Sequence, residues 1–233
     1  MSRMHVFCAA LSVAAACTLH SAAFAGSGTS GNDAPTLGSH GNSSTDTRHP
    51  SESPEQKKAR ALLDAGIQAF DRAGYAQALP LFQQADEAGH MKAPRYIGLM
   101  YLNAFGVKKD EGRAFAEFQK AANRGDITGQ FMLATMYEQG MGITQNLDMA
   151  IHWYRISAQR GDRIAAPAMS ALGRLYEVGR GVPRNMDTAI DWYRRAAATG
   201  DGSALAALQR LGIDAGQAAS SGTEASPAPA AGH

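Results

Sequence analysis

The chain has 233 residues, and its 22 Lys and Arg nearly balance its 21 Asp and Glu, which leaves a formal net charge of +1 at pH 7. This balance lacks the basic excess that nucleic-acid-binding chains direct at phosphate, so no nucleic acid partner is expected. The two cysteines, Cys8 and Cys17, both lie near the N-terminus, which excludes a disulfide framework or a cysteine-ligated zinc site in the rest of the chain.

Residues 1–25 have the pattern of a secretory signal peptide. An apolar run from Val6 to Leu19 is followed by Ala23-Phe24-Ala25, with small residues at both positions that a signal peptidase reads. The run is too short for a membrane-spanning helix. We therefore expect cleavage after Ala25 and a periplasmic or secreted protein. Two alternatives stay open, a retained N-terminal anchor and a lipoprotein modified at Cys17, and a membrane is expected as a partner only if Cys17 is lipidated.

Two low-complexity segments flank the predicted fold. Residues 26–54 are rich in Gly, Ser, Thr, Asn and Pro, with Leu37 as their only large aliphatic residue, and residues 214–233 are rich in Ala, Pro, Gly and Ser. Neither segment can bury enough apolar surface to offset its chain entropy. We expect a disordered leader and a disordered tail around one folded domain at residues 55–213.

The predicted domain contains a pattern that is repeated four times. Ala78, Ala114, Ala150 and Ala189 correspond, at steps of 36, 36 and 39 residues. In each copy an aromatic residue follows four positions later, a small residue follows after three more, and a glycine closes the copy. The aromatic residues are Phe82, Phe118, Tyr154 and Tyr193, and the glycines are Gly89, Gly125, Gly161 and Gly200. The spacing i, i+4, i+7 predicts one stripe of an α-helix, and the glycine predicts a left-handed cap.

A second helix is predicted before this one in each unit. Its markers are an apolar residue, a small residue that lets a neighbouring helix approach closely, and a tyrosine one turn later. In the last three units these are Ile97-Gly98 with Tyr101, Leu133-Ala134 with Tyr137, and Leu172-Gly173 with Tyr176. The loop that follows contains a glycine, which permits backbone angles closed to other residues. These glycines are Gly106, Gly142 and Gly181.

The stretch LGRLYEVGRGVPRNMDTAIDWYRRAAATGD at 172–201 resembles the Sel-one-like repeat, a variant of the tetratricopeptide repeat. The resemblance covers residues 91–201 and implies an all-α fold, an α-α superhelical solenoid of about four helix-turn-helix repeats. We place the units at about 55–90, 91–126, 127–162 and 163–201, with a capping helix at 202–213. The first unit lacks the longer glycine loop and reads as an ordinary tetratricopeptide unit, and the fourth unit has three extra residues near Pro167.

Two further sets of residues have predicted structural roles. Trp153 and Trp192 occupy matching places, and we expect Trp192 to be buried, so that its truncation would cost about 3–5 kcal/mol. Each aspartate that follows a closing glycine stands before a first helix, where it is expected to cap free backbone amides. These residues are Asp126, Asp162 and Asp201.

No catalytic motif is present in the sequence. A zinc-protease helix, a nucleophile elbow, a Ser-x-x-Lys pair and a phosphate-binding loop are all missing. Within the predicted fold the only histidines are His90, expected in a turn, and His152, expected on a solvated face. We therefore expect no catalytic residue, no metal and no cofactor.

The resemblance favours a binding function. In tetratricopeptide-like arrays the first helices line the concave face. The candidate groove residues flank the small-residue markers and are Lys92, Arg95, Leu99, Leu102, Phe131, Thr135, Glu138, Ser170, Arg174 and Glu177. We hypothesise a non-enzymatic protein–protein interaction scaffold, adaptor or regulator of the bacterial cell envelope that binds a protein or peptide there. Because residues 150–213 hold nine basic and five acidic side chains, an anionic glycan is an alternative ligand.

Two other functions stay open at the level of the sequence. The first is an enzyme that acts on cell-wall material, for which Glu138 and Glu177 are the only obvious carboxylates in the candidate groove. They lie one repeat apart, at about 10 Å or more given common helix spacings, which is loose for an acid and base pair. The second is a secreted effector that acts on a host, which the signal peptide permits without favouring it.

Overall fold

The computed structural model describes residues 52–214, which form nine α-helices and, within that range, no strand. The expected all-α helical repeat solenoid is confirmed. The predicted signal peptide, the leader and the tail lie outside the described residues, apart from residues 52–54 and 214. Ser53 caps the first helix by accepting a hydrogen bond from the Gln56 amide, while the Gln56 side chain accepts one from the Ser53 amide.

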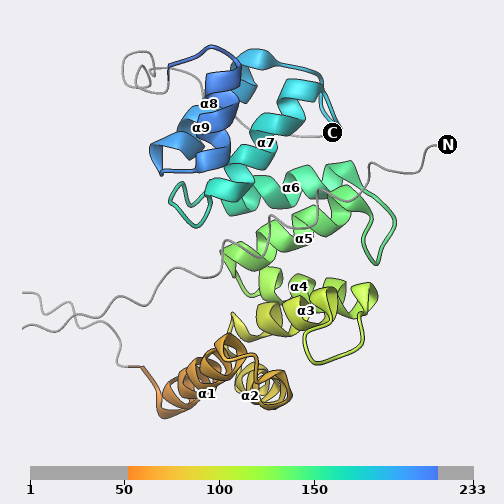
Figure 1. Ribbon diagram of the computed structural model, residues 1–233, viewed down its shortest axis with the longest axis vertical. Helices are drawn as coiled ribbons and strands as arrows, with labels where there is room; N and C mark the ends of the chain where they lie inside the picture. Colours follow the sequence, from red (N-terminus) through yellow and green to blue (C-terminus); the bar gives the residue numbers. More distant parts are fainter. Residues whose placement is uncertain (1–51, 215–233) are drawn as a thin grey trace, which may run out of the picture. The chain divides into compact units, whose positions relative to one another are not determined.

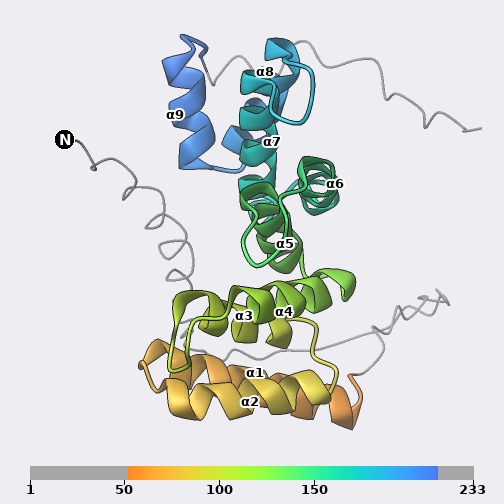
Figure 2. The ribbon, with the colours of Figure 1, turned by 90° about the vertical axis from the view of Figure 1, so that its right-hand side faces the viewer.

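The helices form four hairpins that are stacked in chain order, followed by a single helix (Figure 1). Figure 2 shows the same order from the side. The first helices are α1 (Pro54–Asp71), α3 (Ala93–Asn103), α5 (Ile127–Gln139) and α7 (Ala166–Val178). Their partners are α2 (Tyr75–Glu87), α4 (Glu111–Asn123), α6 (Leu147–Ala158) and α8 (Met186–Ala198), and α9 (Gly202–Arg210) packs on α8. Within the described residues none of the helices has the length and apolarity to cross a bilayer.

Each hairpin closes because a residue with little or no side chain on its first helix faces an aromatic ring on its second. A Cβ atom added at Gly66 would lie 2.6 Å from the Phe82 ring, and one added at Gly173 would lie 2.7 Å from the Tyr193 ring. The backbone of the first helix therefore rests directly on the ring, as the repeated pattern predicts. The rings themselves are buried, with Phe82 at 0% exposure. Loss of such close contacts is costly in a core packed at crystal density.

The glycine loops connect each unit to the one before it. Gly106, Gly142 and Gly181 have φ angles of 68°, 68° and 74°, which confirms the expected left-handed conformation. A methyl group on Gly142 would lie 2.3 Å from the carbonyl oxygen of Glu111, at the start of the preceding unit's second helix. The other two loops approach the starts of α2 and α6 in the same way. The loops thus clasp neighbouring units, a role that the sequence pattern alone did not indicate.

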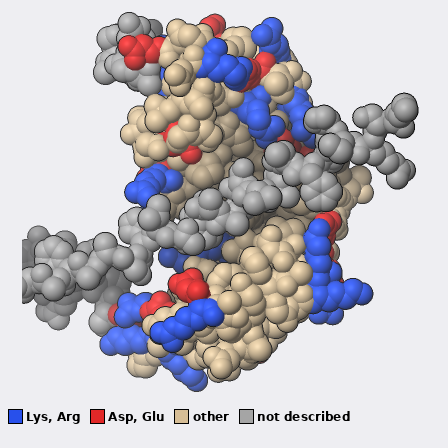
Figure 3. Space-filling model, in the orientation of Figure 1, with Lys and Arg blue, Asp and Glu red and all other residues tan. Residues whose placement is uncertain are grey.

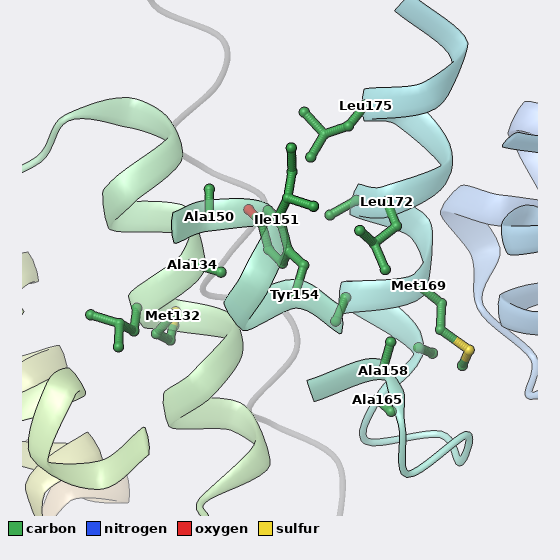
Figure 4. Packing of buried hydrophobic residues seen from close by; sticks show 14 of the residues in the cluster. Met132, Ala134, Ala150, Ile151, Tyr154, Ala158, Ala165, Met169, Leu172 and Leu175 are labelled. Atoms are coloured by element: carbon green, nitrogen blue, oxygen red, sulfur yellow. The ribbon is translucent and has the colours of Figure 1, made fainter. Parts of the chain in front are cut away.

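Side chains from adjacent hairpins interdigitate in the core. Figure 4 shows Tyr154 from α6 between Ala134 of α5 and Leu172 of α7. Tyr154 is 1% exposed, and Leu172 is fully buried. The core is therefore built from contacts between units, and a unit has no complete core of its own.

Two expectations about single residues are wrong. Trp192 is only partly buried, and its ring lies under the guanidinium of Arg195 at 4.2 Å. Side chains of consecutive residues in a helix point about 100° apart, so Trp192 and Tyr193 cannot both face the core. Tyr193 does so and is 4% exposed. Asp162 does not cap a helix, because it accepts from the amides of Ile164 and Ala165 in a turn before α7. The three extra residues of the fourth unit move the start of α7 beyond its reach.

The other two aspartates act as predicted. Asp126 accepts from the Gly129 amide at the start of α5, and Asp201 accepts from the Ala204 amide at the start of α9. The closing glycines Gly125 and Gly200 before them have φ angles of 86° and 87°. The signal Gly-Asp therefore marks the beginning of a first helix correctly where no insertion follows.

Candidate functional site

The structure distributes the ten candidate residues over three first helices. Leu99 on α3 joins the hydrophobic core at 8% exposure, so it offers little surface to a ligand. Lys92, at the start of α3, is exposed. The remaining candidates are partly or fully engaged with neighbouring residues. We use the term first-helix face for the side of α3, α5, α7 and α9 that carries these residues and their arginine partners.

Glu138, near the end of α5, is a buried carboxylate with donors on both oxygens. Its exposure is 3%. Nη2 of Arg174 on α7 donates to both Oε1 and Oε2 at 2.8 Å, and the Tyr154 hydroxyl donates to Oε2 at 2.9 Å. Arg180, in the loop after α7, donates from Nη1 to Oε1 at 3.4 Å and from Nη2 to the backbone carbonyl of Glu138 at 3.2 Å. A buried carboxylate needs such compensation to remain ionised.

Glu177 repeats this arrangement one unit later. The Tyr193 hydroxyl donates to its Oε2 at 2.7 Å, and Nη2 of Arg210 on α9 donates to Oε2 at 2.8 Å and lies 2.7 Å from Oε1. Arg184 donates from Nε to the backbone carbonyl of Glu177 at 3.0 Å. We call the two glutamates, Tyr154, Tyr193, Arg174, Arg180 and Arg210 the glutamate–arginine ladder.

A sequence signal for the ladder exists but was missed in the sequence analysis. The aromatic residue of each unit is phenylalanine in the first two units and tyrosine in the last two. Four residues after the small-residue marker stand Phe70 and Leu102 in the first two units, and Glu138 and Glu177 in the last two. Tyrosine and glutamate thus occur together, because a buried hydroxyl needs an acceptor. The arginine partners had no such signal.

The contacts of the ladder shift the pKa values of both tyrosines, of Glu177 and of Arg174. Burial and the Glu138 carboxylate both raise the pKa of Tyr154, and burial and Glu177 do the same for Tyr193, so both phenols stay protonated at neutral pH. Burial alone would raise the pKa of Glu177, but the hydrogen bonds from Tyr193 and Arg210 outweigh it and lower that pKa. The hydrogen bond to Glu138 raises the pKa of Arg174 although burial opposes it.

In the ladder the glutamates are more deeply buried than the arginines. The side chains of Arg174, Arg180 and Arg210 are 46%, 42% and 58% exposed, whereas Glu138 and Glu177 are 3% and 15% exposed. A molecule that approaches the first-helix face here meets guanidinium groups first. Figure 3 shows basic side chains next to acidic ones over the end of the stack that contains α7 and α8.

The N-terminal part of the first-helix face is built differently. Arg95 on α3 lies 3.5 Å from the capping carboxylate of Asp126 and 4.8 Å from the centre of the Tyr96 ring. Arg95 is thus held between two units, while neighbouring Lys92 remains in solvent. Phe131 on α5 packs obliquely on Tyr154 at 5.7 Å. This part of the face offers one exposed cation and partly exposed apolar groups.

The other candidates have structural partners. Thr135 on α5 lies 3.1 Å from the Tyr154 hydroxyl. Ser170 on α7 donates to Oδ1 of Asp201, the residue that caps α9. Leu102 on α3 is partly buried and packs against the core. The Thr135 contact lies within one hairpin, the Ser170 contact joins α7 to the cap of α9, and the Leu102 side chain packs on the core.

The histidines lie where the sequence indicated. Nδ1 of His90 accepts from the Lys92 amide in the turn before α3, and burial together with the Lys92 charge lowers the pKa of His90. His152 is exposed on α6 beside Trp153. Among residues 52–214, no group of three His, Cys, Asp or Glu side chains is arranged to hold a metal ion.

A hollow of about 430 Å³ lies away from the predicted residues, at the loop between α3 and α4. Its cations are already paired in part, since Lys109 lies 2.7 Å from Glu111 and Arg113 lies 3.3 Å from Asp110. The lining residues are Tyr101, Val107, Lys108, Lys109, Asp110 and Arg113.

The pair of carboxylates considered for an enzyme is committed to the fold. Each of Glu138 and Glu177 accepts hydrogen bonds from a tyrosine and from an arginine of the next unit. A general base needs a free lone pair within reach of a substrate proton. The arrangement is suited to joining repeat units and holding arginines in place.

Comparisons with known proteins agree with this architecture. The family model for the Sel1 repeat matches residues 95–126, 127–162 and 166–201. Among solved structures, the chain is similar to c5321, a protective antigen present in uropathogenic Escherichia coli strains that displays an SLR fold, with 30% identity and a TM-score of 0.60 over 68% of this chain and 35% of that one. It is also similar to a Sel1 repeat protein from Oxalobacter formigenes, with 33% identity and a TM-score of 0.58 over 66% of this chain and 64% of that one.

The chain thus spans about a third of the length of the first structure and just under two thirds of the second. Among curated proteins, none matches the sequence closely enough to count as a relative.

Proposed function

We propose, from the premise that this chain is a helical repeat protein of the Sel1-like repeat (SLR) family, that it is a scaffold that binds a protein partner along its first-helix face. Sel1 repeat proteins generally mediate protein–protein interactions, and their fold is typically a non-catalytic scaffold. The proposal adds the surface on which the partner binds and the part of the cell in which it does so.

One observation carries the assignment of the surface. The packing positions recur from unit to unit, whereas the partly exposed position three residues before the small-residue marker changes from Arg95 on α3 to Phe131 on α5 and Ser170 on α7. On α7 and α9 that surface carries Arg174 and Arg210, which are about half exposed and are paired with the more buried carboxylates of Glu138 and Glu177. A side chain that is already held in one orientation loses less entropy when it binds. The face is therefore both varied and preorganised, as a specific binding surface requires.

A crosslinking experiment tests the surface. A photoreactive amino acid is placed at Lys92, at Thr135 and, as a matched control on a second helix, at the exposed His152. We expect the partner to be crosslinked from the first two positions and not from the third. Equal crosslinking from His152 would overturn the assignment of the first-helix face.

Charge variants provide a second test of the same surface. A Lys92→Ala/Arg95→Ala/Arg174→Gln variant is compared with an Arg72→Ala/Lys109→Ala/Arg163→Ala variant, whose three cations are exposed and lie away from the face. We expect the first set to lose the crosslinked partner and the second to retain it. Identical capture by both variants would argue against the proposal, provided that both give the helical spectrum of the unchanged chain.

We also propose that the protein acts as an adaptor or regulator in the cell envelope, in the periplasm or after secretion. This rests on the signal pattern at residues 1–25, which lie outside the described residues. We expect the exported protein to begin at Gly26, as read by N-terminal sequencing, and Cys17→Ser to be processed in the same way. A mature chain that begins at a lipidated Cys17 would show a lipoprotein, and a chain that keeps residues 1–25 would contradict export by this route.

A further inference from the structure

The ladder arginines have hydrogen-bond donors that the fold does not use. A guanidinium group has five N–H donors. Arg174 uses only Nη2, toward Glu138, and Arg210 uses only Nη2, toward Glu177. In the part of the chain that the structure describes, Nε and Nη1 of both arginines have no hydrogen-bond partner. Both side chains are about half exposed, so these donors are available to a ligand.

The surroundings of these donors favour an anionic ligand. Four cations gather here, Arg174, Arg180, Arg184 and Arg210, around two carboxylates that are satisfied by tyrosine hydroxyls and arginines. The excess of positive charge faces solvent because the glutamates lie beneath the arginines. Carboxylate is the protein group that matches a guanidinium fork in both charge and geometry.

The arginines occur only at one end of the array. Arg174 lies two residues after the apolar marker Leu172 on α7. Arg210 lies two residues after Leu208, the corresponding residue on α9. The corresponding residues on α3 and α5 are Leu99 and Thr135. An anionic ligand is therefore expected at the α7–α9 end, and the chain itself provides unlike units for comparison.

The spacing of the two arginines limits the ligand further. Arg174 lies three residues before Glu177 on α7, and Arg210 on α9 is hydrogen-bonded to the Glu177 carboxylate. Because residues three apart on a helix have Cβ atoms about 5–6 Å apart, the two arginines lie on either side of one glutamate, at roughly 10 Å from each other. An extended polyproline II segment rises about 3.1 Å per residue and repeats its side-chain direction every three residues, or about every 9 Å. We propose that the α7–α9 end of the first-helix face binds an extended acidic segment of a partner protein, with two carboxylates three residues apart, one at Arg174 and one at Arg210. This rests on the proposed function.

Direct binding of synthetic peptides tests the proposal. The full mature chain is titrated with a fluorescent peptide that has two glutamates separated by two residues, and with two controls that have adjacent glutamates or glutamines in their place. We expect the first peptide to bind at least about tenfold more tightly than either control, and binding to weaken with added salt. Equal binding of all three peptides, or no binding of the first, would overturn the proposal.

Variants of the chain locate the contact. Arg210→Gln, which removes a cation from an exposed side chain, is expected to weaken binding about tenfold, and Arg210→Lys, which keeps the charge but not the fork, to weaken it less. Arg163→Gln is the matched control, since this arginine is exposed in the turn before α7. Thermal melting monitors the fold of each variant. Unchanged binding by Arg210→Gln, or an equal loss by Arg163→Gln, would contradict the assigned site.

The outcomes separate this proposal from the broader one. If a partner is crosslinked from Thr135 but binds Arg210→Gln as tightly as the unchanged chain, the acidic ligand is wrong and the first-helix face stands. If crosslinks form from His152 instead, both proposals fail.

Discussion

The hydroxyls of Tyr154 and Tyr193 show how a single atom changes the role of a packing residue. Phe82 and Phe118 fill the same place in the first two hairpins with only apolar contacts. In the last two hairpins the added hydroxyl reaches into the first helix and meets a glutamate. The core position thereby also orients a carboxylate, which in turn holds an arginine of the next unit.

Removal of one hydroxyl tests this coupling. Tyr154→Phe leaves the buried Glu138 with one donor fewer, and we expect it to lower the free energy of unfolding by about 1–2 kcal/mol in urea titrations. The reverse change, Phe118→Tyr, is the matched comparison, because it buries a hydroxyl where the place of the glutamate is taken by Leu102. We expect Phe118→Tyr to lower the free energy of unfolding as well, because its buried hydroxyl has no glutamate acceptor. If both variants keep the unfolding free energy of the unchanged chain, the hydroxyls do not contribute to stability.

Glu177 gives the ladder a pH dependence. Its pKa in the folded protein is lower than its ordinary value of 4.5. Its contribution to stability is therefore fully present above the unfolded pKa and is lost as the pH falls through the folded pKa. We expect Glu177→Gln to reduce the difference in unfolding free energy between pH 7 and low pH, measured by urea titration at each pH. An unchanged difference would contradict the favourable contacts of this carboxylate.

Two glycines with similar backbone angles differ in what surrounds them. Gly142→Ala would place a methyl group 2.3 Å from the Glu111 carbonyl oxygen, whereas nothing lies within 4 Å of a methyl group at Gly125. Both changes strain a positive φ, which costs about 1–2 kcal/mol. We expect Gly142→Ala to cost clearly more than Gly125→Ala, because the loop must also move away from α4. Equal melting temperatures would argue that the loop does not clasp the preceding unit.

At the scale of the helix, the buried face of α8 decides which of its two neighbouring aromatic residues contributes more to stability. Tyr193 lies on the buried stripe and Trp192 on its edge, under Arg195. We expect Tyr193→Ala to cost about 3–5 kcal/mol and Trp192→Ala only about 1–2 kcal/mol, measured by denaturant titration. A larger loss for Trp192→Ala than for Tyr193→Ala would show that Trp192, and not Tyr193, faces the core, as the sequence analysis expected.

Helix α9 takes the place of a first helix, and within residues 52–214 no second helix follows it. It begins with the same Gly-Asp signal as α5 and buries Leu208 where the other first helices bury Leu133 or Leu172. The next position, which holds a small residue in every complete unit, is Gln209 and is exposed. A long polar side chain there leaves no room for the ring of a second helix, so α9 presents a polar outer face, as a capping helix does.

At the scale of the whole molecule, each helix in residues 52–214 packs mainly on its neighbours in the chain. Stability in such a stack is close to a sum of units and of the interfaces between them. Ion pairs join successive units at each step, from Asp86 with Arg124 to Glu177 with Arg210. The glycine loops and the interdigitated core act at the same interfaces.

A truncated chain tests this dependence on neighbours. Removal of everything after Gly200 deletes α9 and uncovers the apolar stripe of α8. We expect amide hydrogen exchange to accelerate strongly in α7 and α8 and little in α1 and α2, since the loss acts through one interface at a time. The control Leu205→Ala changes a residue that is 41% exposed and should leave exchange unaltered. Uniform acceleration along the chain would show that the array unfolds as one cooperative unit.

The sequence by itself determined the repeat, the helix pairs and the residues that close each hairpin, because these contacts join residues of one unit and recur at a constant spacing. It also indicated the caps, except at Asp162, where an insertion moves the helix start. The pairing of tyrosine with glutamate in the last two units is visible in the sequence, but only the tertiary structure decided which arginines bind the glutamates and where the glycine loops contact the preceding unit. Arg174 and Arg210 meet carboxylates 36 and 33 residues earlier in the chain, and which side chains meet across units depends on how the hairpins stack. The spacing of residues along one helix does not determine how the hairpins stack.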